Sequence, residues 1–417
     1  MNQNTLFAAA LGLAAPWKVV RSGLEDGGGG ARFLYVDIEV EAGQPMPCPC
    51  CGKPCPVYDH EVKRWRHLNF WQHATFLSAR VPRVECPAHR VRQVTVPWAR
   101  AESGFTLMFE AFVMALAREM PVRAVGQLVG EHDTRLWRVV RHYVAAAHER
   151  QDWGGVQAVA IDETATRKGH RYATVVVEMD PDKEQPARLL FMTPERSAAS
   201  VGEFVEAMAA HGAHAGQVKL AAIDMSAAYQ KGVGEHLPEA RMVFDRFHVM
   251  ALAGNALDEV RKQLAREGAD VKGALWALRG NESRLGEEQL RLRQNLCARH
   301  KGLGRAMALR ENLQDTWAWP GAASAGFHLK AWCSWAVRSR LAPFKKLAHT
   351  IKKHWEGILA YFPHRITSAA IESINGIIQT ARRRARGFRN FENLKAISYW
   401  MAGHLDLQIP SAFTHPI

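Results

Sequence analysis

Hydrophobic and polar positions alternate most regularly between residues 156 and 244. Short apolar runs, two of them ending at an aspartate, are separated by amphipathic segments, which is typical of strands alternating with helices. The pattern predicts strands at 156–162, 172–179, 188–192, 218–224 and 240–244, and helices at 198–211 and 227–236.

The order of these elements predicts an α/β RNase H-like core with a mixed sheet: three strands, then a helix, a strand, a helix and a strand. The next region, residues 251–360, has a helical pattern throughout, so we expect an all-helical insertion. Its tryptophans are expected to lie in its core rather than to stack on bases: Trp276, Trp317, Trp319, Trp332, Trp335 and Trp355.

Composition adds a partner to this picture. The 417 residues carry a formal net charge of +13 and 47% of them are hydrophobic, which is typical of a basic globular protein. A charge of this size favours a polyanionic partner, and we expect double-stranded DNA. No apolar run reaches the roughly 18 residues that a membrane-spanning helix needs, so we expect no membrane partner and a cytoplasmic, nucleoid-associated protein.

Three acidic residues indicate metal-dependent chemistry. Asp162 and Asp224 each end a predicted strand, and Glu372 begins a later helix-like segment. Phosphodiester cleavage can be driven by two Mg²⁺ (or Mn²⁺) ions, and rigidly held carboxylates are suitable hard ligands for them. We therefore predict a catalytic metal site at these residues; alternatively, the aspartates are ordinary strand-terminal acids. Glu163 should point to the opposite side of its strand, so it is a lesser candidate.

Other polar residues are expected near this site. Asp245 and His248 follow the fifth predicted strand, and either could orient water or a phosphate; alternatively, Asp245 caps the helix that follows. Asn375 and Gln379 lie one and two turns beyond Glu372 on the same face of its predicted helix.

Five of the seven cysteines lie between residues 48 and 86, which favours a metal site over disulfides. Cys48 and Cys51 form a Cys-x-x-Cys pair, and Cys86 and His89 form a Cys-x-x-His pair. Together they predict a structural Zn²⁺ held by three thiolates and one imidazole. Two cysteines are surplus, and the second could replace one of the four ligands: Cys50 and Cys55.

Residues 120–143 predict a helix-turn-helix, whose first helix begins at Pro121 and ends at Gly130. In the second helix, apolar and basic positions lie on different faces, as in a recognition helix that enters a DNA major groove. The alternative is an amphipathic helical hairpin without DNA contacts. The apolar face carries Leu136, Val140 and Tyr143, and the basic positions are Arg135, Arg138 and His142.

A basic run follows Glu372 along its predicted helix. We expect it to line the path by which DNA reaches the metal site, and the alternative is an ordinary solvated face. The run consists of Arg382, Arg383, Arg384 and Arg386.

Taken together, these patterns divide the chain into six segments. They are an N-terminal α/β segment (1–45), a zinc-binding module (46–98), a helix-turn-helix domain (104–150), the first part of the core (155–250), the helical insertion (251–360) and the second part of the core (361–405).

The motifs quoted above, in this order, resemble those of bacterial insertion-sequence transposases of the ISL-three family. The resemblance rests on the blocks that contain Asp162, Asp224, Asp245-Arg246-Phe247-His248 and Ile371-Glu372-Ser373-Ile374-Asn375-Gly376, and on the cysteine motifs followed by Pro97-Trp98-Ala99. It implies a DDE recombinase with the three acids as metal ligands, a helical insertion before the glutamate, and a zinc module followed by a helix-turn-helix.

We therefore predict a DNA transposase that binds the terminal inverted repeats of a mobile element, frees a 3′-hydroxyl and joins it to target DNA. Because two ends must be processed together, we expect a homodimer or larger assembly on DNA. Two alternatives remain: a non-enzymatic DNA-binding regulator, and an RNase H-like nuclease without strand transfer.

Overall fold

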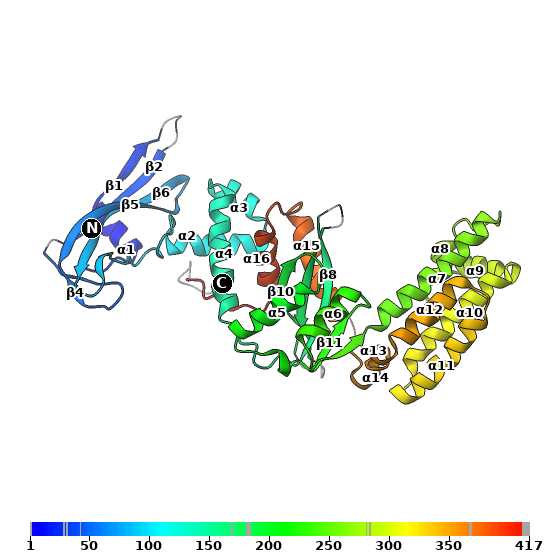
Figure 1. Cartoon of the computed structure of the whole chain (residues 1–417). Coiled ribbons are helices and arrows are strands. Elements are labelled where there is room, and N and C mark those ends of the chain that lie inside the picture. The colour runs from blue at the N-terminus through cyan, green and yellow to red at the C-terminus, as the bar shows by residue number, and fades with distance from the viewer. Residues whose placement is uncertain are drawn as a thin grey trace. The chain divides into compact units, whose positions relative to one another are not determined.

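The computed structural model describes residues 2–410 except 28, 29, 31, 42, 168, 170, 181–184, 281, 283, 284, 367 and 368 (Figure 1). The chain divides into two compact units. Unit 1 comprises the chain up to Tyr143 together with the residues from Leu407, and unit 2 comprises Val144–Asp406.

A five-stranded sheet forms the first part of unit 1. Its strands run in the order β1-β2-β6-β5, with β7 paired to β6, and β2 lies parallel to β6. Strands from both of the first two predicted segments share this sheet, so these segments fold around one core. The strands are β1 (Trp17–Asp26), β2 (Arg32–Val40), β5 (Val57–Phe70), β6 (His73–Cys86) and β7 (Arg90–Gln93); β3 (Met46–Pro47) pairs separately with β4 (Pro54–Cys55), and α1 (Gln3–Ala10) precedes β1.

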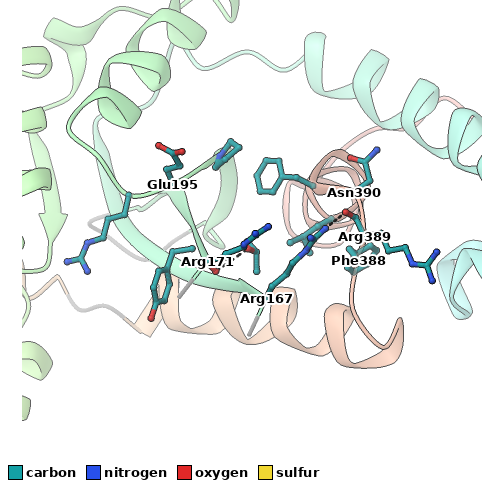
Figure 2. A pocket seen from close by; sticks show the side chains of 12 residues that line it. Arg167, Arg171, Glu195, Phe388, Arg389 and Asn390 are labelled. Carbon is teal, nitrogen blue, oxygen red and sulfur yellow. Dashed lines mark hydrogen bonds between the residues drawn. The ribbon is translucent and has the colours of Figure 1, made fainter. Parts of the chain in front are cut away.

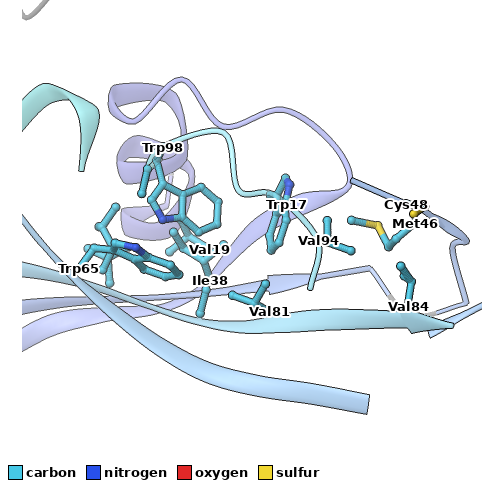
Figure 3. Packing of buried hydrophobic residues seen from close by; sticks show 14 of the residues in the cluster. Trp17, Val19, Ile38, Met46, Cys48, Trp65, Val81, Val84, Val94 and Trp98 are labelled. Atoms are coloured by element: carbon cyan, nitrogen blue, oxygen red, sulfur yellow. The ribbon is translucent and has the colours of Figure 1, made fainter. Parts of the chain in front are cut away.

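Three tryptophans meet in the core beneath this sheet (Figure 3). The Trp98 ring packs edge-on against Trp17, at 4.9 Å between ring centroids, and against Trp65, at 5.6 Å. Edge-to-face aromatic pairs stabilise a core beyond the area that they bury. Trp98 lies just before the helical part of unit 1, so the packing ties this part to the sheet.

Three helices complete unit 1: α2 (Leu107–Glu119), α3 (Val122–Val129) and α4 (Asp133–Glu149), the last of which continues into unit 2. Two glycines make the turn between α3 and α4 possible. Gly130 ends α3 with φ of 70°, a left-handed conformation that glycine adopts without strain. A Cβ atom on Gly126 would lie 2.6 Å from the carbonyl oxygen of Glu131, so only glycine allows this close approach.

The sheet of unit 2 has the order β10-β9-β8-β11-β12. Strand β9 is antiparallel to both β10 and β8, whereas β11 lies parallel to both β8 and β12. The strands are β8 (Ala158–Arg167), β9 (Arg171–Glu178), β10 (Arg188–Pro194), β11 (Leu220–Ile223) and β12 (Arg241–Phe244), each overlapping a predicted strand.

Helices lie on both faces of this sheet. Tyr229 of α6 (Ala227–His236) hydrogen-bonds to Thr174, which pairs with Glu163 and shares its face. Gln379 of α15 (Ala369–Arg384) donates to Thr164, on the opposite face because neighbouring side chains of a strand alternate. In addition, α5 (Ala199–Ala210) packs on α6, and α16 (Phe391–Ala402) packs on α15.

The inserted region is helical throughout its described part: α7 (Arg246–Arg266), α8 (Ala274–Arg279), α9 (Glu287–Arg299), α10 (Lys301–Asp315), α11 (Ala322–Arg338), α12 (Ala342–Lys353), α13 (Trp355–Leu359) and α14 (Tyr361–His364). Trp317 and Trp332 are buried, as predicted. The prediction of core positions is wrong for Trp276, Trp319 and Trp335, because they lie on solvent-facing sides of this region.

Candidate functional site

The register of the sheet brings two predicted acids together. Strand β8 pairs in parallel with β11 as far as Ile161 and Ile223, and Asp162 and Asp224 are the next residues of each chain segment. Neighbouring strands lie about 4.8 Å apart, so the two carboxylates start from adjacent positions. Asp162 does not end its strand as predicted, because β8 remains paired with β9 up to Arg167 after β11 has ended.

Electrostatics support this proximity. Burial raises the pKa of Asp162, and the nearby charge of Asp224 raises it further, whereas a backbone hydrogen bond from Glu163 and the charges of His248 and Arg196 act in the opposite direction. A buried carboxylate beside a second carboxylate favours the binding of a cation. Because the charge of His248 lowers the pKa of Asp162, His248 lies near this site.

Arg196 bridges Asp224 and Glu163, a role that the sequence analysis missed. Its Nη2 donates to Oδ2 of Asp224 at 3.0 Å, and its Nη1 lies 2.7 Å from Oε2 of Glu163. Strands β8, β10, β11 and β12 run in one direction, so the residues that follow β10, β11 and β12 meet at one sheet edge. The predicted strand order could therefore have indicated that Arg196 lies near the acids, because it follows the third strand by two residues.

Helix α15 docks along β8 through the face that carries Glu372. Nδ2 of Asn375 donates to Oδ2 of Asp162 at 3.1 Å, and Nε2 of Gln379 donates to Oγ1 of Thr164 at 2.9 Å. Residues three or four apart are neighbours on a helix. Glu372, which is exposed in the first turn of α15, therefore lies one turn before the residue that contacts Asp162.

The donor set of this site fits a hard cation. Besides the carboxylates, Oδ1 of Asn375 is buried and has no hydrogen-bond partner among the residues that the structure describes, and carboxylate and amide oxygens suit Mg²⁺. Asp162, Asp224 and Glu372 nevertheless do not form, within the described part of the chain, a group whose ligand atoms all lie within 4.8 Å.

Asp245 follows β12 and is buried. Its Oδ1 accepts a hydrogen bond from the backbone N–H of Phe247 at 3.1 Å, so it caps the N-terminus of α7. The capping alternative of the sequence analysis is thus confirmed, and a role in orienting water or phosphate stays a prediction for Asp245 and His248.

A second group of metal-ligating residues lies in unit 1. Ligand atoms of Cys48, Cys51, Cys86 and His89 all lie within 4.8 Å of one another. The Cys51 and Cys86 sulfurs are 3.8 Å apart, and Nδ1 of His89 is 3.5 Å from the Cys86 sulfur. Burial opposes ionisation of Cys86, but hydrogen bonds from the backbone N–H groups of Ala88 and His89 and from the neighbouring cysteine side chains together lower its pKa to about 7.

The two surplus cysteines lie outside this group. Cys50 is exposed, and the buried Cys55 donates through its thiol to the carbonyl oxygen of Lys53 at 3.4 Å. Three sulfurs and one imidazole nitrogen suit a tetrahedral structural zinc ion, which thiolates favour over Mg²⁺.

In α4, the predicted apolar face is buried: Leu136, Val140 and Tyr143. The predicted basic positions divide into two kinds. All three are exposed, but Arg135 also forms an ion pair with Glu131 and lies over the Phe105 ring, 4.4 Å from its centroid.

Arg135 belongs to a cluster around Arg66, whose side chain is only 3% exposed. The Nε of Arg66 lies 3.7 Å from Oε1 of Glu131, and its Nη2 donates to the carbonyl oxygen of Val129 at 3.4 Å. Arg66 is part of β5, so this cluster fastens the sheet of unit 1 to its helices. Sequence patterning did not reveal it, because the partners are more than sixty positions apart.

The basic run at the end of α15 is also divided. Arg383, Arg384 and Arg386 are exposed. Arg382 is half-buried, and its Nη1 donates to the carbonyl oxygen of Ala165 at 2.5 Å, which fastens α15 to β8.

Comparison with known proteins agrees with this arrangement. Residues 159–398 match a family described as "Transposase" of the ISL3 type, residues 94–144 match "Helix-turn-helix domain of transposase family ISL3", and residues 44–89 match "zinc-finger of transposase IS204/IS1001/IS1096/IS1165". None of the helices in the described ranges is both long and apolar enough to cross a membrane.

Two curated relatives extend the similarity over most of the chain. The transposase for insertion sequence element IS1557 of Mycobacterium tuberculosis is 31% identical over 424 residues, covering 94% of this chain and 93% of the relative. The transposase for insertion sequence element IS1001 of Bordetella parapertussis is 30% identical over 363 residues, covering 83% and 86%. The chain therefore belongs to the ISL3 family of insertion-sequence transposases.

Proposed function

We propose that this transposase cleaves the ends of its mobile element and joins the freed 3′-hydroxyl to target DNA, with Asp162, Asp224 and Glu372 as its catalytic acids. The observation that carries the proposal is the register that puts Asp162 beside Asp224, together with the docking of the Glu372 face of α15 along β8. An RNase H-like core fits the sheet order, in which the first strand, β8, is central, with β11 parallel to it on one side and β12 parallel to β11 beyond.

The three acids would hold Mg²⁺ or Mn²⁺, aided by the unpaired amide oxygen of Asn375. Such ions, when bound, neutralise the attacked phosphate and activate the attacking oxygen. The protein's own part is to hold the carboxylates rigidly: Asn375 orients Asp162, and Arg196 orients Asp224. Cys48, Cys51, Cys86 and His89 would hold Zn²⁺ with a purely structural role.

DNA binding falls to the exposed basic residues in this proposal. Arg138 and His142 on α4 would contact the terminal inverted repeats, and Arg383, Arg384 and Arg386 would guide the strand towards the acids. Two predicted DNA contacts remain, Arg135 and Arg382. We propose that their main role is to stabilise the fold, because Arg135 pairs with Glu131 and Arg382 donates to the carbonyl oxygen of Ala165.

We further propose that residues 155–250 and 361–405 are two halves of one catalytic core, separated by the insertion at 251–360. The other segment boundaries given above also stand as proposals. Two element ends require two active sites, so the working form would be a homodimer or larger assembly on DNA.

The test uses Asp162→Asn and Glu372→Gln proteins and labelled DNA that carries the element ends. Both variants should bind this DNA with unchanged affinity but neither cleave nor join it in Mg²⁺. Glu239→Gln, which changes an exposed acid far from the site, is the matched control and should retain full activity. Strand transfer by either catalytic variant would contradict the proposal, and cleavage without joining by the unaltered protein would indicate a nuclease.

A further inference from the structure

A pocket of about 910 Å³ opens in unit 2 (Figure 2). Its walls come from the facing ends of β8 and β9, the segment after β10 and the turn between α15 and α16. This volume lies in the range of about 300–1,000 Å³ that is usual for small-molecule sites. Of its lining residues, the roles proposed above use Arg196, which orients Asp224.

The pocket is basic: four arginines and one acid, Glu195, are among its lining residues, and one of these arginines, Arg196, is already paired with Glu163 and Asp224. One arginine supports another: Nη2 of Arg167 donates to the backbone carbonyl oxygen of Arg389. Like charges gathered around one hollow repel one another unless an anion lies between them, and guanidinium groups match phosphate oxygens in geometry. The four are Arg167, Arg171, Arg196 and Arg389.

Aromatic side chains line the same space. Tyr172, Phe388 and Phe391 are each half-buried at its wall. Phe388 follows a turn in which Arg386 and Gly387 both have positive φ, and Figure 2 shows it beside Arg389. Arginines interleaved with aromatic rings are typical of sites that bind nucleotides, because the rings stack on a base while the arginines hold its phosphates.

Arg196 joins this pocket to the acids. It lines the pocket and also donates to Asp224. Glu195 precedes it with φ of 72°, a strained conformation held by the hydrogen bond from its N–H to the carbonyl oxygen of Tyr172 at 3.0 Å. Strain maintained in this way is common at functional sites, and here it turns the chain so that Arg196 reaches both places.

We propose that this pocket binds one nucleotide of the DNA strand next to the cleavage point, turned out of the duplex, with its base against the aromatic residues and its phosphate against the arginines. The inference rests on the proposed function. Contact with an intact duplex backbone would need only a basic surface, whereas a walled pocket with rings suits an unstacked base. Extruding the nucleotide would bend the strand towards the acids and expose the phosphate to be cleaved.

The experiment places the fluorescent base 2-aminopurine at successive positions of element-end DNA, with Ca²⁺ in place of Mg²⁺ to prevent cleavage. Fluorescence of this base rises when it leaves the stack. The full-length protein should raise it at one position near the cleavage point. Arg171→Ala and Phe388→Leu should abolish the rise and slow cleavage about tenfold, since the extruded base or its phosphate loses its partner in the pocket. Arg241→Ala, which changes an exposed arginine at the start of β12 outside the pocket, is the matched control and should leave the rise intact.

The outcomes separate this inference from the proposed function. Normal cleavage in Mg²⁺ without a rise at any position would overturn the inference alone, as would a rise that survives in both pocket variants. Absence of cleavage by the unaltered protein would overturn the proposed function and the inference with it. A second measurement guards against misfolding of the variants: an abasic nucleotide at the responsive position costs little to unstack, so it should restore cleavage by Phe388→Leu.

Discussion

The zinc group, formed by Cys48, Cys51, Cys86 and His89, and the three proposed catalytic acids are built in contrasting ways. The four residues of the zinc group come from two short turns, and their ligand atoms already lie within 4.8 Å of one another. The three acids come from two strands and a helix spread over more than two hundred positions of the chain, and only Asp162 and Asp224 are brought together by sheet register.

This difference fits the roles that we propose for the two sites. Local turns suffice for a closed structural site, whereas a catalytic site must leave room for substrate and tolerate carboxylates that repel one another. Around the acids, Asn375 and Arg196 supply hydrogen bonds that steady the repelling groups. Changes at the zinc group should therefore act mainly on folding, and changes at the acids mainly on activity.

The largest effect is expected from loss of zinc. Cys51→Ser should leave unit 1 unfolded and abolish binding to element-end DNA, because structural zinc contributes about 10 kcal/mol or more to the folding of small modules. Zinc content and DNA binding by gel shift measure this. Cys50→Ser changes an exposed cysteine outside the group and should keep one zinc ion per chain. Equal zinc loss in both variants would show that the ligand set is wrong.

The second effect concerns the cluster that fastens the sheet of unit 1 to its helices. Glu131→Gln leaves the buried charge of Arg66 unpaired and should destabilise unit 1 by about 3–5 kcal/mol. Urea denaturation of the full chain, with zinc content followed in parallel, measures the loss. Glu119→Gln breaks an ion pair of two exposed side chains and should change stability by less than about 1 kcal/mol. Similar losses of stability in both variants would contradict the proposed role of the cluster around Arg66.

At the acids, removing a supporting contact should affect chemistry rather than folding. Asn375→Ala frees Asp162 and should lower the cleavage rate about 10–100-fold, with a higher Mg²⁺ requirement and unchanged DNA affinity. Cleavage assays across Mg²⁺ concentrations test this. Thr380→Ala, an exposed position of the same helix, serves as the control. An unchanged Mg²⁺ requirement would remove Asn375 from the site.

The smallest effect is a gain in stability. Burial raises the pKa of Asp162 in the folded protein, so its ionised form is disfavoured there and folding is weakened at neutral pH. Asp162→Asn should therefore raise the free energy of unfolding of the metal-free protein, on the order of 1 kcal/mol at pH 7. This gain should disappear as the pH falls below the ordinary value of 3.8, where the carboxyl is protonated in both states. The free energy of unfolding, measured by denaturation at several pH values, tests this prediction. A gain that does not depend on pH would show that the raised pKa of Asp162 is not its cause.

Much of this architecture could be predicted from apolar runs and cysteine spacing, because both report burial or local ligand geometry. Apolar runs do not report strand pairing, so the continuation of β8 beyond Asp162 through polar residues escaped prediction. Contacts between residues distant in sequence were not predicted for the same reason: Arg196 with Asp224, and Arg66 with Glu131. Solvated faces were not predicted well either, as the exposed Trp276 shows.

The central claim is that Asp162, Asp224 and Glu372 hold the same cations. It is tested most directly by replacing Mg²⁺ with Fe²⁺ and mapping where the radicals generated at the bound iron cut the polypeptide. We predict cuts close to all three residues, suppressed together by excess Mg²⁺ and abolished together by Asp162→Asn. Cuts near Asp162 and Asp224 without any near Glu372 would contradict the account.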